Sequence, residues 1–127
     1  TRKRGEELAA LVADRTPAQS SYVPWDGAYV VPESTAVLVN ATSIGFHPSV
    51  DIPDVAPSSI RPGPVVADVV ANPPDTAFLQ LAQAQGAITL QGLGMLVNQA
   101  LTNARLWTGR DLDADVMHRA LTASLLP

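Results

Sequence analysis

Residues 40–46 combine amide, hydroxyl and glycine groups directly after an apolar run at 36–39. Side chains such as Asn40 and Thr42 can hydrogen-bond to their own backbone and hold a tight turn. Gly45 permits a positive φ or the close approach of a ligand. The segment therefore predicts either an ordinary turn or the place where a ligand meets the end of a strand.

A second set of residues suited to binding lies on one face of a helix expected over 92–108. At 100° per residue, Met95 and Gln99 fall about 300° and about 340° round from Gly92, so all three share a narrow sector. Glycine admits a ligand to the backbone, methionine supplies a soft apolar contact, and glutamine both donates and accepts. The alternative is that Met95 belongs to the core and Gln99 is solvated.

Three cations, Arg2, Lys3 and Arg4, stand where a helix over 4–15 begins. The helix dipole disfavours positive charge there, and a bound phosphate turns that penalty into an attraction. The alternative is a solvated helix end, with Glu6 and Glu7 close by.

The remaining titratable residues offer no catalytic or metal-binding pattern. Asp68 lies inside the apolar run 65–70, so it must accept hydrogen bonds from nearby donors and is expected to be structural. His47 and His118 form no metal-ligand spacing. With no cysteine, a disulfide framework, a thiolate zinc site and a cysteine nucleophile are excluded.

Apolar runs at 36–39, 65–70 and 87–90 predict strands, because runs without polar alternation suit a parallel sheet covered on both faces by helices. A weaker strand is expected at 20–25, where Pro24 interrupts it. Such sheets bind ligands at the carboxyl ends of their strands. We therefore expect Thr42, Met95 and Gln99 to face one crevice.

Helices separate these strands and complete the α/β pattern. A turn at 72–75 leads into a helix that Asn72 or Asp75 caps and that ends near Gly86. A last helix is expected from about Asp111 to Leu125. The stripe expected to be buried along 92–108 consists of Leu93, Val97, Ala100, Ala104 and Trp107.

Composition fits one modest domain. The chain has 127 residues, a net charge of -4 and 46% hydrophobic residues, which argues against disorder and against a basic nucleic-acid surface. No apolar run approaches the roughly 20 residues of a membrane span, and no signal peptide is seen. We expect a cytoplasmic protein. Because the sequence starts with Thr1 rather than Met, we also expect it to be part of a longer chain.

Four segments in this order resemble the carboxyl-terminal half of shikimate dehydrogenases. They are Asn-Ala-Thr-Ser-Ile-Gly at 40–45, Asp-Val-Val-Ala-Asn-Pro-Pro-Asp-Thr at 68–76, Gly-Leu-Gly-Met-Leu-Val-Asn-Gln-Ala at 92–100 and Leu-Trp-Thr-Gly at 106–109. The similarity begins at the amino terminus, where residues 2–8 resemble the segment after the second strand of that family's cofactor domain.

The resemblance implies a partial Rossmann-like NAD(P)-binding domain with a mostly parallel sheet that lacks its first two strands. It would occupy 1–127, with 110–127 as a carboxyl-terminal helix. The implied activity is the NADP-dependent interconversion of 3-dehydroshikimate and shikimate. Arg4, or else Arg2 or Lys3, would meet the 2′-phosphate of NADP. The other implied contacts are Asn40, Ala41, Thr42 and Ser43 with ribose and pyrophosphate, Gly92 and Met95 with nicotinamide, and Gln99 with a substrate hydroxyl.

The sequence also departs from the family pattern. Ala71 stands where the family usually has Tyr near the substrate, Phe46 where it usually has Met, and Gln91 where Asp or Asn is common. The family's catalytic Lys and Asp lie in an amino-terminal domain, so no catalytic residue is assigned here and the chain alone is expected to be inactive.

Several alternatives stay open. The chain can belong to a quinate or other cyclic hydroxy acid dehydrogenase, or to an amino-acid-dehydrogenase-like protein. It can also be a non-catalytic module that binds a nucleotide or a protein. If the first strands are absent, a bare sheet edge is expected to promote self-association or pairing with a companion chain.

Overall fold

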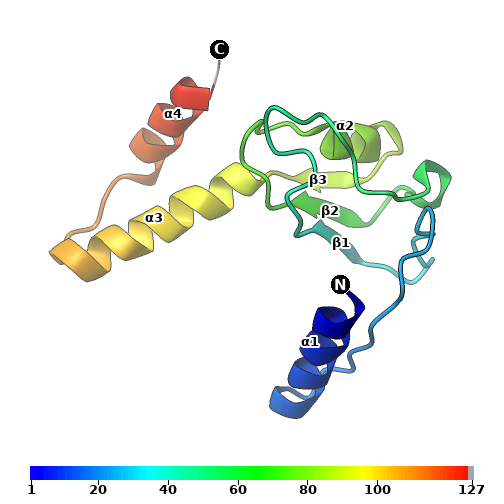
Figure 1. Cartoon of the computed structure of the whole chain (residues 1–127). Helices are drawn as coiled ribbons and strands as arrows, with labels where there is room; N and C mark the ends of the chain where they lie inside the picture. The colour runs from blue at the N-terminus through cyan, green and yellow to red at the C-terminus, as the bar shows by residue number, and fades with distance from the viewer. Residues whose placement is uncertain (126–127) are drawn as a thin grey trace.

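The computed structural model describes residues 1–125 and has an α/β architecture. Its elements are α1 (Arg2–Arg15), β1 (Val37–Asn40), a 3-10 turn η1 (Pro57–Ser59), β2 (Val65–Asp68), α2 (Ala77–Ala84), β3 (Ile88–Leu90), α3 (Gly92–Thr108) and α4 (Ala114–Leu125). Within the described residues the strands form one parallel sheet in the order β1-β2-β3 (Figure 1). The parallel α/β fold expected from the sequence is confirmed.

The strand register aligns the carboxyl ends of β1 and β2. Val37 pairs with Val65, and Asn40 pairs with Asp68. The last residues of both strands therefore lie side by side, next to the turns that follow them.

One face of the sheet carries the hydrophobic core. Val66 of β2 packs under Phe78, Leu79 and Ala82 of α2, and all four are 2% exposed or less. Burying each of the larger side chains, Val66, Phe78 and Leu79, contributes about 1.5–3 kcal/mol, so this layer stabilises the fold.

The opposite face of the sheet is open, which corrects the expectation that helices cover both faces. Val37 and Val39 of β1 are 57% and 50% exposed, and Ile88 and Leu90 of β3 are each 60% exposed. These side chains alternate along β1 and β3 with side chains that are less exposed. The apolar composition therefore indicates strands whose two faces can both be buried. It does not indicate whether helices pack against both faces.

Thr76 caps α2, where the sequence had indicated Asn72 or Asp75. Its side chain accepts a hydrogen bond from Leu79 N at 3.3 Å. Gly86 follows the helix with φ 81°, as a glycine at a helix end is expected to do.

The expected strand at 20–25 is wrong. The structure places no strand there, and the nearest pairing is an isolated bridge between Tyr29 and Val55. Trp25 instead donates from Nε1 to the carbonyl oxygen of Asp54 at 2.8 Å. Pro24 also lacks an N–H to donate to a neighbouring strand.

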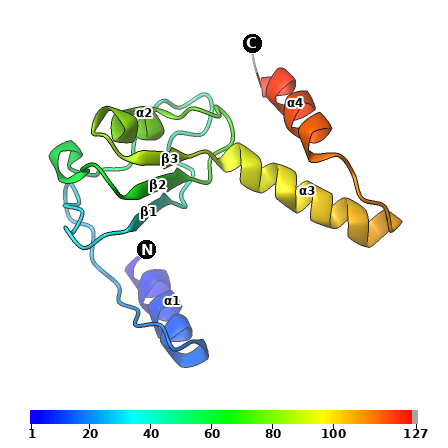
Figure 2. The same ribbon diagram turned by 180° about the vertical axis from the view of Figure 1, so that it is seen from behind.

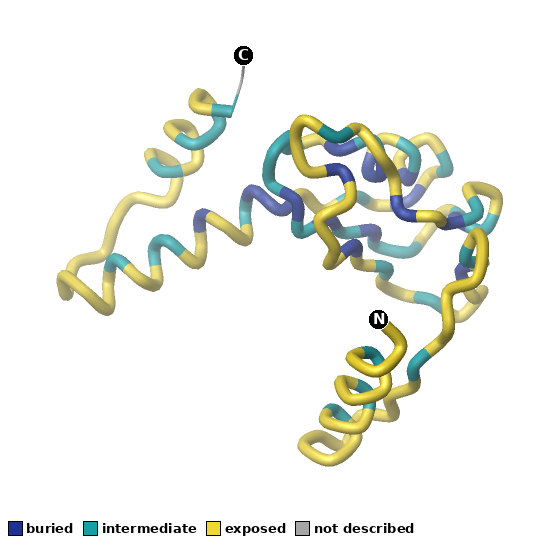
Figure 3. Tube along the Cα trace, in the orientation of Figure 1, coloured by how far each residue is buried: buried dark blue, intermediate teal, exposed yellow. Residues whose placement is uncertain are grey.

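α3 has the expected bounds, but its buried stripe is shorter than expected. Leu93 and Val97 are buried, whereas Trp107 is 81% exposed. Figures 1 and 2 show the reason, since the helix leaves the end of the sheet and extends away from it. Its burial accordingly fades along its length in Figure 3.

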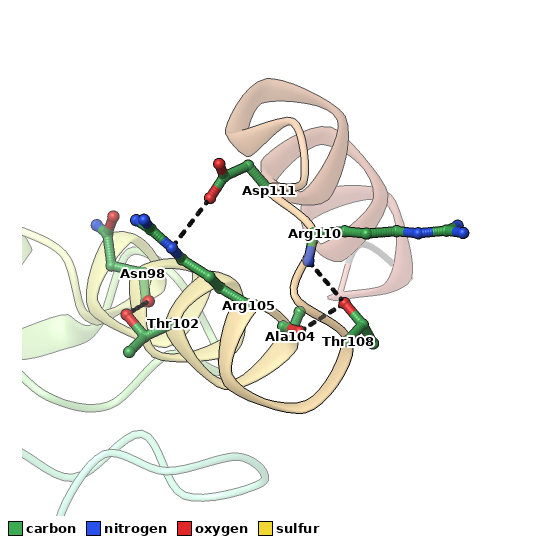
Figure 4. Close-up of polar contacts among 7 residues, drawn as sticks. All are labelled: Asn98, Thr102, Ala104, Arg105, Thr108, Arg110 and Asp111. Carbon is green, nitrogen blue, oxygen red and sulfur yellow. Dashed lines mark hydrogen bonds and ion pairs between the residues drawn. The ribbon is translucent and has the colours of Figure 1, made fainter.

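The last helix begins at Ala114 rather than near Asp111, because Asp113 acts as its cap. Asp113 Oδ1 accepts hydrogen bonds from Asp115 N at 2.8 Å and Val116 N at 3.1 Å. Residues 126–127 of the helix expected over 110–127 lie outside the described residues. Figure 4 shows the segment between α3 and α4, whose Asp111 pairs with Arg105 of α3 at 3.5 Å.

No helix among residues 1–125 is both long and apolar enough to cross a membrane.

Candidate functional site

The turn after β1 is held by the side chain of Asn40, which is 4% exposed. Asn40 Oδ1 accepts from Thr42 N at 3.1 Å and from Thr42 Oγ1 at 2.7 Å. Asn40 Nδ2 donates to the Ile44 carbonyl oxygen at 3.1 Å. Thr42 Oγ1 in turn accepts from Ile44 N at 3.1 Å. The polar residues of 40–44 thus hold one another in a defined turn.

This turn is linked to the turn after β2. His47 N donates to the Asn72 carbonyl oxygen at 2.9 Å. Gly45, between the two contacts, has φ 90°, a conformation that side chains rarely adopt. The loops that follow β1 and β2 therefore form one continuous wall at the carboxyl end of the sheet.

Asp68 is buried and fully hydrogen-bonded, as the sequence predicts. It is 2% exposed and accepts hydrogen bonds from Asn40 Nδ2, Val70 N and Thr76 Oγ1. With its oxygens satisfied inside the protein, this carboxylate is not available to a substrate.

A mostly apolar cavity of about 480 Å³ lies beside the turn. It is lined by Trp25, Tyr29, Leu38, Asn40, Thr42, Ile44 and Phe78, among others. The rings of Trp25 and Tyr29 are tilted by 49° with centroids 5.5 Å apart. These two aromatic residues carry no signal of a site in the sequence, because they belong to an irregular segment without periodicity.

α3 begins directly against the end of β2. A Cβ atom on Gly92 would lie 2.6 Å from the Val69 carbonyl oxygen and 2.8 Å from that of Asp68. The glycine is therefore required for this close approach of helix and strand. This contact sets the position of the first turn of α3 relative to β2, and so the position of the helix face that carries Met95 and Gln99.

That face of α3 lines a groove of about 490 Å³ with Met95, Asn98, Gln99, Thr102 and Asn103. Met95 is 43% exposed, so it lies at the surface rather than in the core. Asn98 Nδ2 donates to the Gly94 carbonyl oxygen at 2.8 Å, and Thr102 Oγ1 donates to that of Asn98 at 2.9 Å (Figure 4 shows the second bond). The helical spacing that places Gln99 on this face also places Asn103 there, a residue not expected at the site.

The expectation that Thr42, Met95 and Gln99 face one crevice is wrong. Thr42 lines the first cavity, whereas Met95 and Gln99 line the groove on α3. The reason is the direction of α3, which starts at the carboxyl end of the sheet and then extends away from it (Figure 1). The structure thus brings 40–44 together, and Met95 with Gln99, but not the two sets.

The basic residues at the start of α1 are solvent-exposed. Arg2 pairs with Glu6 at 2.8 Å and Lys3 with Glu7 at 3.9 Å. Arg4 makes no ion pair among the described residues, so it is the cation of this cluster that remains available to an anion. Ala41 and Ser43 are exposed on the turn after β1.

Over the range 1–125, no group of three or more His, Cys, Asp or Glu side chains is arranged to hold a metal ion.

Comparisons with known proteins agree on one family. Its sequence model, described as the shikimate 5'-dehydrogenase C-terminal domain, matches residues 92–122. A curated NADP(+) shikimate dehydrogenase of Desulforamulus reducens is 34% identical over 122 residues, which are 94% of this chain and 42% of that protein. The chain thus spans less than half the length of this relative.

Two solved structures are similar to the fold. Ligand-free 5-ketofructose reductase of Gluconobacter sp. strain CHM43 matches 97% of this chain and 44% of its own, with 43% identity and a TM-score of 0.91. Shikimate 5-dehydrogenase of Thermus thermophilus, solved with NADP(H) and shikimate, matches 71% of this chain and 34% of its own, with 33% identity and a TM-score of 0.65. The chain therefore belongs to the shikimate dehydrogenase family, as the counterpart of the carboxyl-terminal part of its members.

Proposed function

We propose that the chain is the cofactor-binding part of an enzyme that interconverts 3-dehydroshikimate and shikimate with NADP. The observation that carries the proposal is its similarity to an NADP-dependent shikimate dehydrogenase over 94% of its length. The strand-end turns and the face of α3 line two separate hollows, but both begin at the carboxyl end of the sheet, so one extended dinucleotide is proposed to contact both.

Bound NADP supplies or accepts the hydride in this chemistry. The roles of the chain's own residues follow from their chemistry and exposure. Arg4, which makes no ion pair within residues 1–125, holds the 2′-phosphate, with Arg2 and Lys3 beside it. The turn residues Asn40, Ala41, Thr42 and Ser43 support the ribose and pyrophosphate.

The face of α3 completes the proposed contacts. Gly92 and the exposed Met95 lie along the nicotinamide ring. Gln99, also exposed, bonds a hydroxyl group of shikimate or a similar cyclic hydroxy acid. None of these residues transfers a proton, so the isolated chain is expected to show no turnover.

A second candidate is the reduction of a sugar ketone such as 5-ketofructose. It is favoured by the 43% identity and TM-score of 0.91 to 5-ketofructose reductase over 97% of the chain. Ala71, which replaces the usual Tyr near the substrate, also fits a changed substrate. The two candidates share the reduction of a ketone and differ in the molecule reduced.

An assay of the intact gene product that carries these residues decides between them. NADPH absorbance would be followed with 3-dehydroshikimate and with 5-ketofructose, and with NADP+ in the reverse direction with shikimate and with quinate. We expect kcat/KM to favour 3-dehydroshikimate by more than about tenfold. The opposite ranking supports the second candidate, and quinate as the preferred alcohol supports the quinate alternative. No turnover of any of these substrates rejects the enzymatic proposals and leaves a binding module.

A matched pair of variants tests the face of α3. Gln99→Ala should raise the substrate KM by about tenfold, as expected for a lost hydrogen bond of about 1.4 kcal/mol, and leave the Kd of NADP+ unchanged. Asn98→Ala is the control, because the Asn98 amide bonds within its own helix. Equal effects of the two variants would contradict the assignment of Gln99.

We also infer that the free edge of β1 pairs with a further strand, from a companion segment or a second copy. Within the described residues β1 pairs only with β2, and its Val37 and Val39 are at least half exposed. Light scattering of the purified chain should show self-association, and a clean monomer at high concentration would count against it.

The proposed location is the cytoplasm.

A further inference from the structure

Asp68 joins three elements at the carboxyl end of the sheet. It is the last residue of β2, and its Oδ1 accepts from Asn40 Nδ2 and from Val70 N, each at 3.0 Å. Its Oδ2 accepts from Thr76 Oγ1 at 2.7 Å, and Thr76 is the cap of α2. One buried carboxylate thus connects β1, β2 and α2.

The contact with Asp68 is one of four hydrogen bonds that fix which way the Asn40 amide points. Asn40 Nδ2 donates to Asp68 Oδ1 and to the Ile44 carbonyl oxygen, while Asn40 Oδ1 accepts twice from Thr42. Rotating the amide by 180° would turn its oxygen toward two acceptors and its NH2 toward the Thr42 N–H. Since the Asp68 carboxylate oxygen only accepts, it favours, together with the Ile44 carbonyl oxygen, the orientation that supports Thr42.

We propose that Asp68 is a positioning residue for the dinucleotide, acting through the orientation of Asn40 on the turn 40–44. This inference rests on the proposed function, which places that turn against the cofactor. Asn40 already uses two N–H groups and two lone pairs inside the protein. Neither it nor Asp68 needs to touch the ligand, because the turn they hold presents Ala41, Thr42 and Ser43.

Three substitutions separate this role from general stability. Asp68→Ala removes the acceptor that faces Asn40. Asp68→Asn is the conservative variant, because its Oδ1 still accepts from Asn40 while its Nδ2 donates to Thr76 Oγ1. Thr76→Ala is the matched control, because it removes the Thr76 contact and the cap of α2 but leaves the bond between Asn40 and Asp68 intact.

The first measurement needs no cofactor. Hydrogen exchange of the Thr42 amide, whose acceptor is Asn40 Oδ1, is compared in the 127-residue chain. We expect Asp68→Ala to accelerate this exchange at least about tenfold, corresponding to about 1.4 kcal/mol of local protection, and Asp68→Asn and Thr76→Ala to change it less than about threefold. Equal acceleration by Thr76→Ala, or none by Asp68→Ala, overturns the proposal.

Asn40→Asp keeps the test decisive if Asp68→Ala does not fold. This variant retains acceptors for Thr42 but places a second carboxylate against Asp68. If the Asn40 acceptor alone held the turn, Thr42 would stay protected. Because two carboxyl groups this close share a proton at low pH, the proposal predicts that Thr42 loses its protection as the pH rises and this proton is lost. A Thr42 amide that exchanges at the wild-type rate at every pH at which Asn40→Asp stays folded overturns it.

The second measurement is a calorimetric titration with NADP+. We expect Asp68→Ala to weaken binding about tenfold and Asp68→Asn and Thr76→Ala to leave it within about threefold, a loss of about 1.4 kcal/mol for the first variant alone. Unchanged affinity in Asp68→Ala overturns the role in cofactor positioning. If the wild-type chain takes up no NADP+, the proposed function fails for this chain, and the Thr42 exchange rates still decide whether Asp68 orients Asn40.

Discussion

The contact between α3 and the end of β2 leads to a sharp prediction about Gly92. In Gly92→Ala the new Cβ would meet the Val69 carbonyl oxygen at 2.6 Å, the Val69 carbonyl carbon at 2.7 Å and the Asp68 carbonyl oxygen at 2.8 Å. These are backbone atoms, so relief requires the helix to move away from the strand. Overpacking of this kind costs about 1–3 kcal/mol.

Gly94 is the matched control on the same helix. A Cβ there would meet nothing within 4 Å. Gly94→Ala should therefore stabilise the chain by about 0.5–1 kcal/mol, the usual difference between glycine and alanine inside a helix. The two substitutions are chemically identical and only two residues apart, yet we expect opposite signs.

Urea denaturation followed by circular dichroism measures both effects. The free energies of unfolding of the two variants should differ by at least about 1.5 kcal/mol, which separates their midpoints by roughly 0.5 M or more for ordinary slopes. A Gly92→Ala midpoint at or above that of the wild type would refute the close packing of α3 on β2. So would an equal loss in Gly94→Ala.

Three further predictions concern the core, the cofactor contact and the last helix. Phe78→Ala should cost about 3–5 kcal/mol in urea unfolding, because Phe78 is 2% exposed, whereas Trp107→Ala should change stability by less than about 0.5 kcal/mol because Trp107 is 81% exposed; similar losses would contradict the fold. Arg4→Ala should weaken NADP+ binding about tenfold in calorimetry and leave NAD+ binding unchanged, while Arg2→Ala has a smaller effect because Arg2 is already paired; equal losses for both dinucleotides would exclude a contact of Arg4 with the 2′-phosphate. Asp113→Ala should lower the stability of α4 by about 0.5–2 kcal/mol, seen as faster amide exchange in its first turn, and an unchanged rate would exclude the cap.

Local signals in the sequence predict the elements of the fold. The three strands and α3 appear where apolar runs and helical spacing place them, and Gly109 ends α3 with φ 68°. These features depend on backbone preferences and on residues close in sequence. The errors at element ends have equally local causes. Thr76 caps α2 in place of Asn72 or Asp75, and Asp113 caps α4, which begins later than expected.

The sequence does not predict what covers each element. Val39 and Leu90 have the composition of strand residues buried on both faces, and Trp107 lies on the apolar stripe of α3, yet all three are at least half exposed. Burial depends on which other segments pack against an element, and composition reports only which side chains can be buried. For the same reason, the sequence does not predict the direction of α3. This direction divides the expected crevice into two hollows.

The polar residues at the carboxyl ends of the strands now divide into two kinds. A carboxyl group inside an apolar strand must find donors, and this requirement predicts from sequence alone that Asp68 is internally bonded. The structure adds that one of its donors is Asn40, a residue that the family resemblance places at the cofactor. Because Asn40 has no hydrogen-bonding capacity left, its contribution to binding must come from the shape of the turn it holds. Residues that hold the turn are therefore distinct from residues that the turn presents. Substitutions of the residues that hold the turn should weaken the binding of NADP+ only to the extent that Thr42 loses its hydrogen bonds with Asn40.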